Sequence, residues 1–155
     1  MQKMQISFYV LSESKAQDFL GFICQLTQTA LNKSTQSLLI LVDDDPLIKQ
    51  LDEALWANDA TSFIPHHRLL DTKTDFSTHK FLAPVLLSAY MPVDFDGIVI
   101  NTTVYPINDF ITSTSNASPT RILEIIKPDR ISVQEGRNKY KSYQQLGYEL
   151  THFKV

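Results

Sequence analysis

The chain has 155 residues, 43% of them hydrophobic and 20% charged, which is typical of a globular protein with a buried core. Its net charge of −3 argues against a dedicated nucleic-acid binder, and its single cysteine, Cys24, excludes an internal disulfide. The first residues lack the apolar run of a signal peptide, and no run reaches the length of a membrane span. We therefore expect a single cytoplasmic domain over residues 1–155 without a membrane partner.

Apolar runs and helical spacing alternate along the chain. In chain order they predict a strand at 5–11, a helix over 15–32, a strand at 37–42, a helix over 46–56, a short strand at 63–65, a loop at 67–83, strands at 85–87 and 97–101, a polar turn at 112–120, a strand at 121–126, a helix over 131–146 and an edge strand at 148–155. Such alternation predicts a three-layer α/β/α fold with an open, mostly parallel sheet.

Local signals mark several of these boundaries. Asp45 followed by Pro46 is typical of a helix start, with Asp45 as the N-cap. Gly147 is suited to the position just after the last helix. Cys24 falls on the apolar face of the first helix, so we expect it in the core.

A nucleotide-binding site is not expected. The chain has four glycines, and none stands in a GxGxxG or GxxxxGK[ST] pattern. Without such a loop the backbone cannot approach a pyrophosphate closely. The sequence therefore predicts a Rossmann-like fold that lacks a phosphate loop and holds no cofactor.

An acidic cluster offers an alternative, catalytic interpretation. Asp43, Asp44 and Asp45 follow a predicted central strand, where open α/β sheets place their sites, and clustered carboxylates can hold Mg²⁺. In this interpretation the protein is a metal-dependent phosphoryl-transfer or receiver-like domain, and the three aspartates bind its metal ion. Helix capping beside a solvated acidic turn is the simpler explanation. Neighbouring His66 and His67 point to opposite faces of an extended segment, which predicts a hydrogen-bonded histidine at a strand end and no metal site.

Trp56, the only tryptophan, does not fit the stripe expected to be buried by the helix over 46–56. On a helical wheel at about 100° per residue, the apolar residues between Leu47 and Leu55 fall in one arc, and Trp56 lies roughly 80° beyond it. A large amphipathic ring outside the core stripe is either a lid at the helix end or a contact for another molecule. The wheel alone does not separate these two interpretations.

The last predicted helix combines an aromatic face with a basic edge. The side chains that share one face of the wheel are Val133, Gly136, Tyr140 and Tyr143. Arg137 borders this face, and Lys141 lies further round. Residues 127–141 hold five basic and two acidic residues, a local charge of +3. A guanidinium beside the hollow at Gly136 suits a carboxylate and an apolar side chain together, whereas the alternative is simple packing of tyrosines on the sheet with a solvated basic edge.

Several motifs resemble one family. FYVL, LILVDD, LDEALW followed by SFIPH, PVLLS, IVIN, EII and RNKYKSYQQLGYEL occur in this order from about Phe8 to Leu150. They resemble the chi subunit of the bacterial DNA polymerase III holoenzyme. LDEALW with SFIPH is the most specific match, and the R-x-x-Y-x-x-Y-x-x-x-G pattern from Arg137 to Gly147 is the second.

The resemblance implies a non-catalytic replisome adaptor, that is, an accessory subunit of a DNA-directed DNA polymerase complex. It implies binding to the acidic C-terminal tail of single-stranded DNA-binding protein. It also implies a second surface for the psi subunit, which connects the family to the clamp loader, or for an XPD-like helicase. Direct contacts with DNA are expected to be weak or indirect, because the basic patch is small and the chain is acidic.

Two sets of residues follow from the resemblance. The tail-binding residues are Val133, Arg137, Tyr140, Lys141, Tyr143 and Gly147. The residues of the second surface are Trp56, Phe63, Pro65 and His66. Val133 stands where some members have a basic residue, which weakens the expected contact with the acidic side chains of the tail. The stretches 67–83 and 112–120 match no pattern of the family.

Overall fold

The computed structural model describes residues 4–33, 36–56, 66–68, 84–92, 94–111 and 117–155. Its strands are β1 (Gln5–Val10), β2 (Leu38–Leu41), β3 (His66–Arg68), β4 (Val85–Ser88), β5 (Ile98–Asn101), β6 (Arg121–Ile126) and β7 (Glu149–Lys154). Its helices are α1 (Glu13–Gln17), α2 (Phe19–Lys33), α3 (Asp45–Trp56), the 3-10 turn η1 (Ile107–Asp109) and α5 (Arg130–Gln145).

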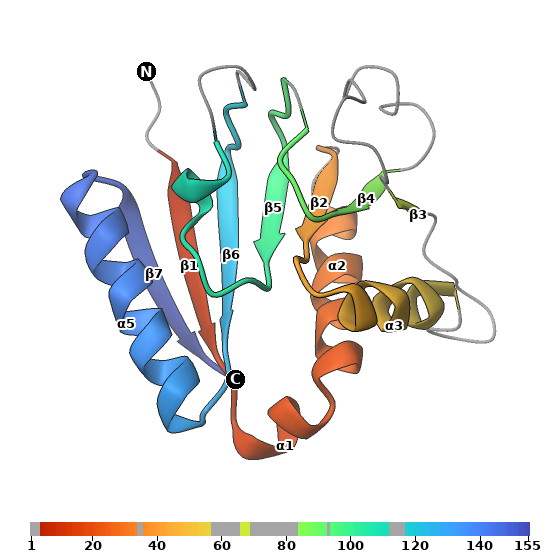
Figure 1. The fold of residues 1–155 in the computed structure, drawn as a ribbon, viewed down its shortest axis with the longest axis horizontal. Helices are drawn as coiled ribbons and strands as arrows, with labels where there is room; N and C mark the ends of the chain where they lie inside the picture. The colour runs from red at the N-terminus through yellow and green to blue at the C-terminus, as the bar shows by residue number, and fades with distance from the viewer. Residues whose placement is uncertain (1–3, 34–35, 57–65, 69–83, 93, 112–116) are drawn as a thin grey trace.

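The seven strands form one sheet in the order β3-β4-β2-β5-β6-β1-β7. Every pairing between them is parallel. Helices α2 and α3 pack on one face of the sheet, and α5 packs on the other (Figure 1). The three-layer α/β fold predicted from the sequence is therefore confirmed. In the described part of the chain, no helix is long and apolar enough to span a membrane.

The burial of the strands follows from their composition. β2, β4 and β5 have buried side chains on both faces, as a continuous apolar sequence in the middle of a parallel sheet requires. β7 is mostly exposed because it lies at the edge of the sheet, as predicted. Cys24 is buried, also as predicted, and burial raises the pKa of its thiol.

The topology leaves a crevice at one end of the sheet. After β2 the chain runs through α3 toward the β3 edge, whereas after β6 it runs through α5 toward the β7 edge, on the opposite face (Figure 1). The two connections diverge at the carboxyl ends of β2, β5 and β6. Open parallel sheets hold ligands at such points.

Besides shifts of one or two residues at the ends of elements, the structure differs from three local predictions. The helix predicted over 15–32 is two helices, because Asp18 leaves the helical conformation with φ −110° and ψ 54°. The N-cap of α3 is Asp44, whose Oδ1 accepts a hydrogen bond from Leu47 N at 3.3 Å, so Asp45 is already helical. Assignments at helix ends commonly differ by one residue.

The third difference concerns the segment after α3. The short strand predicted at 63–65 lies outside the described residues, and β3 instead occupies His66–Arg68, pairing with β4. His66 therefore begins a strand and does not close one. For the same reason, the loop predicted at 67–83 is wrong at its first two residues, while 69–83 lie outside the described residues.

Candidate functional site

Helix α5 is held in place by its two ends and by a glycine. At its start the Asp129 carboxylate accepts a hydrogen bond from Ser132 N at 3.0 Å, and this bond holds the pKa of Asp129 below its usual value. At its end Gly147 has φ +78°, a left-handed conformation that suits glycine. In the middle Gly136 faces β6, where an added Cβ would lie 2.8 Å from Ile126 Cδ1. Glycine thus allows α5 to approach the sheet closely.

Beside this close approach, the face of α5 toward β1 and β7 borders a largely apolar pocket of about 380 Å³. The side chains or backbone that line it belong to Phe8, Val10, Ile126, Val133, Gly136, Arg137, Tyr140, Lys141 and His152. β1 contributes the apolar floor and β7 contributes His152. The His152 ring lies 5.5 Å from the Phe8 centroid and 5.0 Å from the Tyr140 centroid. The His152 ring stacks on Phe8 and is tilted against Tyr140, and together the three rings form an aromatic surface that an apolar side chain can pack against.

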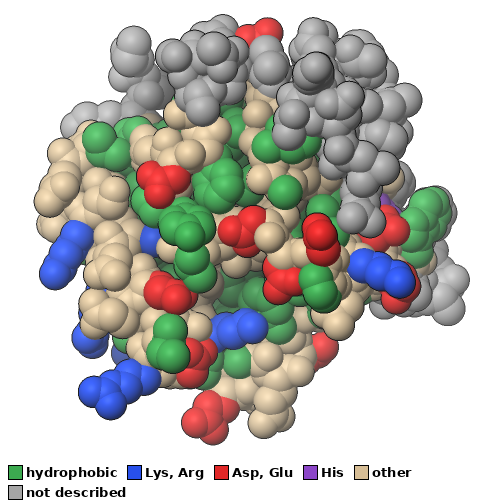
Figure 2. Space-filling view, viewed as in Figure 1, with side chains coloured by type: hydrophobic (Ala, Val, Ile, Leu, Met, Phe, Trp, Pro, Cys, Tyr) green, Lys and Arg blue, Asp and Glu red, His purple; other side chains and the backbone are tan. Residues whose placement is uncertain are grey.

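The rim of this pocket is basic. Arg137 and Lys141 are both exposed, and neither forms an ion pair with any carboxylate in the described residues. Figure 2 shows Lys and Arg side chains projecting from the side formed by α5, while Asp and Glu side chains gather nearer the middle of this view. A guanidinium and an ammonium beside an apolar hollow can hold a carboxylate while the hollow accepts a hydrophobic group.

Beneath α5 lies a buried polar network. Lys139 Nζ is 2.9 Å from Glu124 Oε1 and also donates to the carbonyl of Thr103, and both charged side chains are almost fully buried. Tyr143 OH donates to Glu124 Oε2 at 2.5 Å, and Asn101 Nδ2 donates to the same oxygen at 2.9 Å. Every oxygen of the carboxylate is thus satisfied, as a buried charge requires. The network ties α5 to β6 and to the chain after β5.

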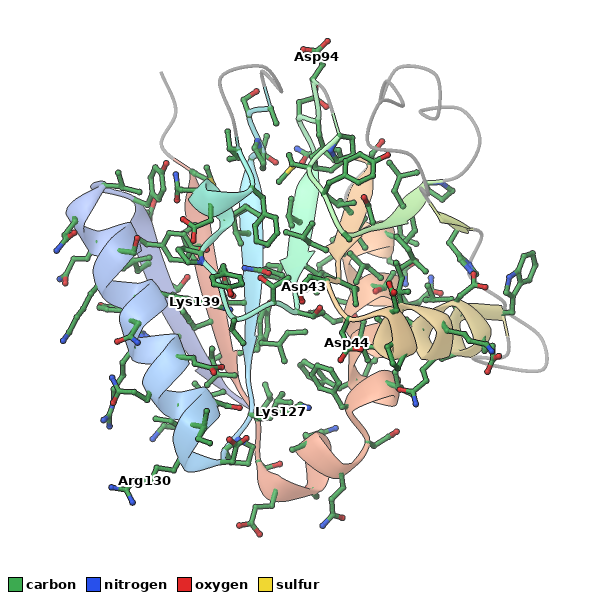
Figure 3. The ribbon with its side chains drawn as sticks, viewed as in Figure 1. Asp43, Asp44, Asp94, Lys127, Arg130 and Lys139 are labelled. Atoms are coloured by element: carbon green, nitrogen blue, oxygen red, sulfur yellow. The ribbon has the colours of Figure 1, made fainter. Side chains whose placement is uncertain are left out.

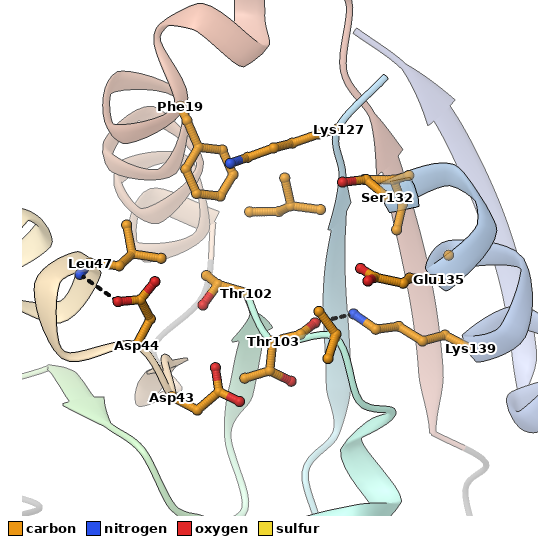
Figure 4. A pocket seen from close by; sticks show the side chains of 14 residues that line it. Phe19, Asp43, Asp44, Leu47, Thr102, Thr103, Lys127, Ser132, Glu135 and Lys139 are labelled. Carbon is orange, nitrogen blue, oxygen red and sulfur yellow. Dashed lines mark hydrogen bonds between the residues drawn. The ribbon is translucent and has the colours of Figure 1, made fainter. Parts of the chain in front are cut away.

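A polar cleft of about 240 Å³ occupies the crevice at the carboxyl ends of the strands. Figure 4 shows Asp43 and Asp44 on one side of it and Glu135 on the other. Lys127 lies at its upper end with Nζ 4.3 Å from the centre of the Phe19 ring, a cation–π contact.

The acidic cluster that suggested a metal enzyme does not form a metal site in the described structure. Asp44 caps α3, as the simpler explanation required. Among the described residues, no group of three or more His, Cys, Asp or Glu side chains is arranged to hold a metal ion. The cleft does bring Asp43 and Asp44 together with Glu135, a partner from α5 that sequence reasoning did not find.

Trp56 is the last residue of α3, which lies on the far side of the sheet from α5 (Figure 1). Its side chain is 56% exposed, while Ile48, Leu51 and Leu55 are buried, as the helical wheel predicted. The indole meets the His66 ring edge to face, with centroids 5.2 Å apart. His66 Nε2 lies 2.6 Å from Asp52 Oδ1, which confirms that this histidine is hydrogen-bonded, although it begins a strand and does not close one. Phe63 and Pro65 lie outside the described residues.

Comparison with known proteins matches this chain to one family along nearly its whole length. The family model for the DNA polymerase III chi subunit, HolC, matches residues 3–151. The chain belongs to the DNA polymerase III chi subunit family. A curated relative, DNA polymerase III subunit chi of Escherichia coli (strain K12), is 26% identical over 147 residues, which cover 93% of each chain.

Membership of the chi family confirms the resemblance inferred from the motifs and decides the question of catalysis. Chi is an accessory subunit of DNA polymerase III and not a catalytic one. The enzyme interpretation based on Asp43–Asp45 is therefore set aside.

The structure brings together only some of the residues that were predicted to form one site. Val133, Arg137, Tyr140 and Lys141 all line the apolar pocket. Tyr143 does not line it, because its ring is fully buried and its hydroxyl is bound to Glu124. The remaining predicted residue, Gly147, is exposed, does not line the pocket, and ends the helix.

Sequence reasoning missed two contributions to this region. Phe8 and His152 come from strands at opposite ends of the chain, and only the β1–β7 pairing places them opposite each other. Lys139 was counted among the basic residues of the surface, whereas it is buried and neutralised by Glu124. A glutamate in the middle of the apolar strand RILEII was the available signal, since a buried carboxylate needs a partner.

Proposed function

We propose that this chain is a non-catalytic adaptor of the replication machinery in the cytoplasm. In this proposal the apolar pocket beside α5 binds the acidic C-terminal tail of single-stranded DNA-binding protein. A second surface around Trp56 binds the psi subunit, and through it the clamp loader of DNA polymerase III, or a helicase of the XPD-like type. The chain would thereby couple protein on single-stranded DNA to the polymerase complex.

The pocket supports the first part of this proposal most directly. When the last residue of a peptide is apolar, its hydrophobic side chain and the free terminal carboxylate are bonded to the same Cα atom. The pocket offers an apolar cavity lined by Phe8, Tyr140 and His152, with the Arg137 guanidinium at its rim. The two halves of the ligand thus meet matching chemistry within one site. Lys141 adds positive charge at the same rim.

Isothermal titration calorimetry with the tail peptide of the host's single-stranded DNA-binding protein tests this assignment. We expect Arg137→Ala to weaken binding roughly 10- to 100-fold, because a hydrogen bond to a charged group contributes about 1.5–3 kcal/mol. An amidated peptide, which lacks the terminal carboxylate, should show a similar loss with the unchanged protein. Combining the variant with the amidated peptide should cost little more than either change alone, because both remove the same contact.

Lys49→Ala is a matched control, since Lys49 is an exposed cation on α3 and outside the pocket. It should bind like the unchanged protein. Equal affinity for the Arg137→Ala variant and the unchanged protein would refute the assignment of this pocket to the tail.

The surface around Trp56 supports the second part. A large aromatic side chain that is half exposed at the end of a helix is a common centre of a protein interface. The hydrogen bond between Asp52 and His66 holds the ring against which the indole rests. An aromatic that is already oriented loses less entropy on binding.

A further inference from the structure

The polar cleft at the carboxyl ends of β2, β5 and β6 belongs to neither of the two proposed binding surfaces. Among the described residues, it shares only Ile126 and Gly136 with the apolar pocket, and neither Trp56 nor His66 lines it. Its volume of about 240 Å³ is many times the roughly 10–15 Å³ that one water molecule needs, so it has room for a side chain. Clefts at this position of an open parallel sheet are common ligand sites.

The two walls of the cleft both carry negative charge. Asp43 and Asp44 lie on the wall formed by the end of β2, and Glu135 lies on the wall formed by α5 (Figure 4). None of these three carboxylates forms an ion pair in the described part of the chain. Glu135 is half-buried, and its carboxylate has no hydrogen-bond partner among the described residues. A partly desolvated charge without a partner is unfavourable, so a cation held between the walls would be stabilised.

The cations of the cleft do not neutralise this charge. Lys139 is buried and pairs with Glu124 on the sheet. Lys127 lies with Asp43 in the space between α5 and α3, and its Nζ rests on the Phe19 ring without forming an ion pair in the described structure (Figure 3). Among the described residues that line the cleft, this leaves three carboxylates against a single unpaired cation.

The arrangement of these charges selects the chemistry of the ligand. No three of the described His, Cys, Asp or Glu side chains are arranged to hold a metal ion, and carboxylates repel the phosphates of a nucleic acid. A guanidinium group is planar and has five N–H donors, so it can donate to both walls at once. The hydroxyl of Ser132, half-buried at the same cleft, offers a further acceptor. The ligand group expected here is therefore an arginine side chain.

Two exposed apolar side chains, which we call the Tyr105 shelf, stand at the rim of the cleft. Val104, which also lines the cleft, is 48% exposed, and Tyr105 is 51% exposed. The loop that carries them is fixed, because Asn101 Nδ2 donates to the Tyr105 carbonyl at 2.8 Å and Tyr105 N donates to Thr103 Oγ1 at 3.3 Å. Neighbouring apolar side chains exposed on a fixed loop are suited to contact another protein.

A further hollow extends the cleft past α3 and the start of α2. This hollow, of about 390 Å³, shares Phe19, Asp44, Leu47 and Lys127 with the cleft and adds the carboxylate of Asp18. A small free cation would occupy only the cleft, whereas an extended peptide can contact the shelf, the cleft and the hollow together. The continuous surface therefore favours a peptide segment as the ligand.

We propose that the polar cleft and the Tyr105 shelf form a third binding surface, which takes a basic peptide segment of a partner protein. The arginine of this segment enters between Asp43 and Glu135, and the apolar residue next to it packs on the shelf. The surface has the opposite charge preference to the apolar pocket, whose rim is basic. Acidic and basic segments of partner proteins are thereby directed to different places on the chain.

NMR titration of the ¹⁵N-labelled full chain with the capped dipeptide acetyl-leucyl-arginine amide tests the proposal. We expect saturable shifts of the amide signals of Thr102, Thr103 and Glu135, with a dissociation constant on the order of 1 mM for so small a ligand. The matching citrulline peptide, in which an uncharged urea replaces the guanidinium, should bind at least about tenfold more weakly. Added salt should weaken binding of the arginine peptide, because the cleft is open to solvent.

Two charge variants should move the affinity in opposite directions. Glu135→Gln should weaken binding about three- to tenfold, more than an exposed carboxylate would, because Glu135 is half-buried. Lys127→Met should strengthen binding about two- to threefold, since it removes a like charge from the cleft. Tyr105→Ser should weaken binding of this dipeptide but not of acetyl-glycyl-arginine amide, which has no apolar side chain for the shelf. Glu53→Gln, on an exposed glutamate of α3 outside the cleft, is the matched control and should change nothing.

The same titrations contain the results that would overturn the proposal. An absence of saturable binding in the millimolar range would refute it. Equal binding of the citrulline peptide would show that the guanidinium is not recognised. If neither Glu135→Gln nor Lys127→Met changed the affinity, while the amide spectra showed both variants folded, the arginine would not lie in this cleft and the proposal would be wrong.

Discussion

Glu124 and Lys139 form an ion pair inside the protein, where an unpaired charge is very costly. Lys139 is only 3% exposed, and the Glu124 carboxylate has no solvent contact. Replacing Lys139 by Met leaves that carboxylate buried without its cation, so we expect the free energy of unfolding to fall by about 3–5 kcal/mol. Urea denaturation followed by circular dichroism measures the change.

A control for this prediction lies on the same helix. Lys141→Met removes an exposed charge two residues further along α5, and its effect on stability should stay within about 0.5 kcal/mol. Equal losses in the two variants would mean that the buried pair is not specifically important. If the prediction holds, Lys139 should not be counted as part of the basic surface that faces a ligand.

Tyr143 makes the stability of the protein depend on pH in the alkaline range. Burial, aided by the nearby Glu124 carboxylate, raises the pKa of its hydroxyl above the ordinary value of about 10. The folded state thus favours the neutral phenol, so this contribution to stability is complete below about pH 10 and is lost as the pH rises further. We expect the free energy of unfolding to fall above about pH 10, by up to about 1.4 kcal/mol per pH unit from this group.

The Tyr143→Phe variant has no hydroxyl to ionise at this position, so it isolates the contribution of Tyr143 to the pH dependence of stability. The variant should be less stable at neutral pH by about 1–3 kcal/mol, because Ile107 N and Glu124 each lose a hydrogen bond to the hydroxyl. Above about pH 10 its stability should fall less steeply than that of the unchanged protein. Urea denaturation at a series of pH values measures both slopes, and parallel curves would contradict the prediction.

At the scale of secondary-structure elements, the end of α5 distinguishes a structural residue from a binding residue. Gly147 has φ +78° and open space around it, so an added Cβ costs only the strain of the left-handed conformation. We expect Gly147→Ala to lower stability by about 1–2 kcal/mol and Gly147→Asn by less. Affinity for the tail peptide should not change in either variant. Thermal denaturation measures the change in stability, and calorimetry measures the affinity for the peptide. A loss of affinity without a loss of stability would mean that Gly147 contributes to the binding site.

The sequence predicted the elements well where burial alone determines the pattern. α5 and β2 were found because each carries the apolar spacing of its own secondary structure. The break at Asp18 was not found, because neither a proline nor a glycine occupies that position. A strand of three residues such as β3, whose sequence is HHR, has no apolar pattern to detect and depends on its pairing with β4.

The binding pocket was predicted only in part, for a related reason. Helical spacing placed Val133, Arg137 and Tyr140 together, since they lie on one stripe of a single helix. Phe8 and His152 come from other elements, and their contribution depends on the strand order, which the spacing of one helix does not contain. The same spacing placed Tyr143 on the binding face, although its ring is fully buried in the core.

At the scale of the whole molecule, the two proposed binding surfaces lie on opposite sides of the sheet. The apolar pocket is beside β1 and β7 at one edge, whereas Trp56 is beside β3 near the other edge (Figure 1). Four strands, β4, β2, β5 and β6, lie between β3 and β1 in the sheet order, and neither Trp56 nor His66 is among the described residues that line the apolar pocket. Sites this far apart without shared residues are expected to bind independently.

This separation predicts two variants with opposite defects. Trp56→Ala should abolish the complex with the psi subunit or the helicase, because it removes the central aromatic of that surface, yet it should bind the tail peptide normally. Arg137→Ala should lose the peptide and keep the second partner. A pull-down of native partners with each variant, together with calorimetry on the peptide, measures both properties. If Trp56→Ala also lost peptide binding, or lowered the melting temperature strongly, the tryptophan would be a structural residue and the second surface would have to lie elsewhere.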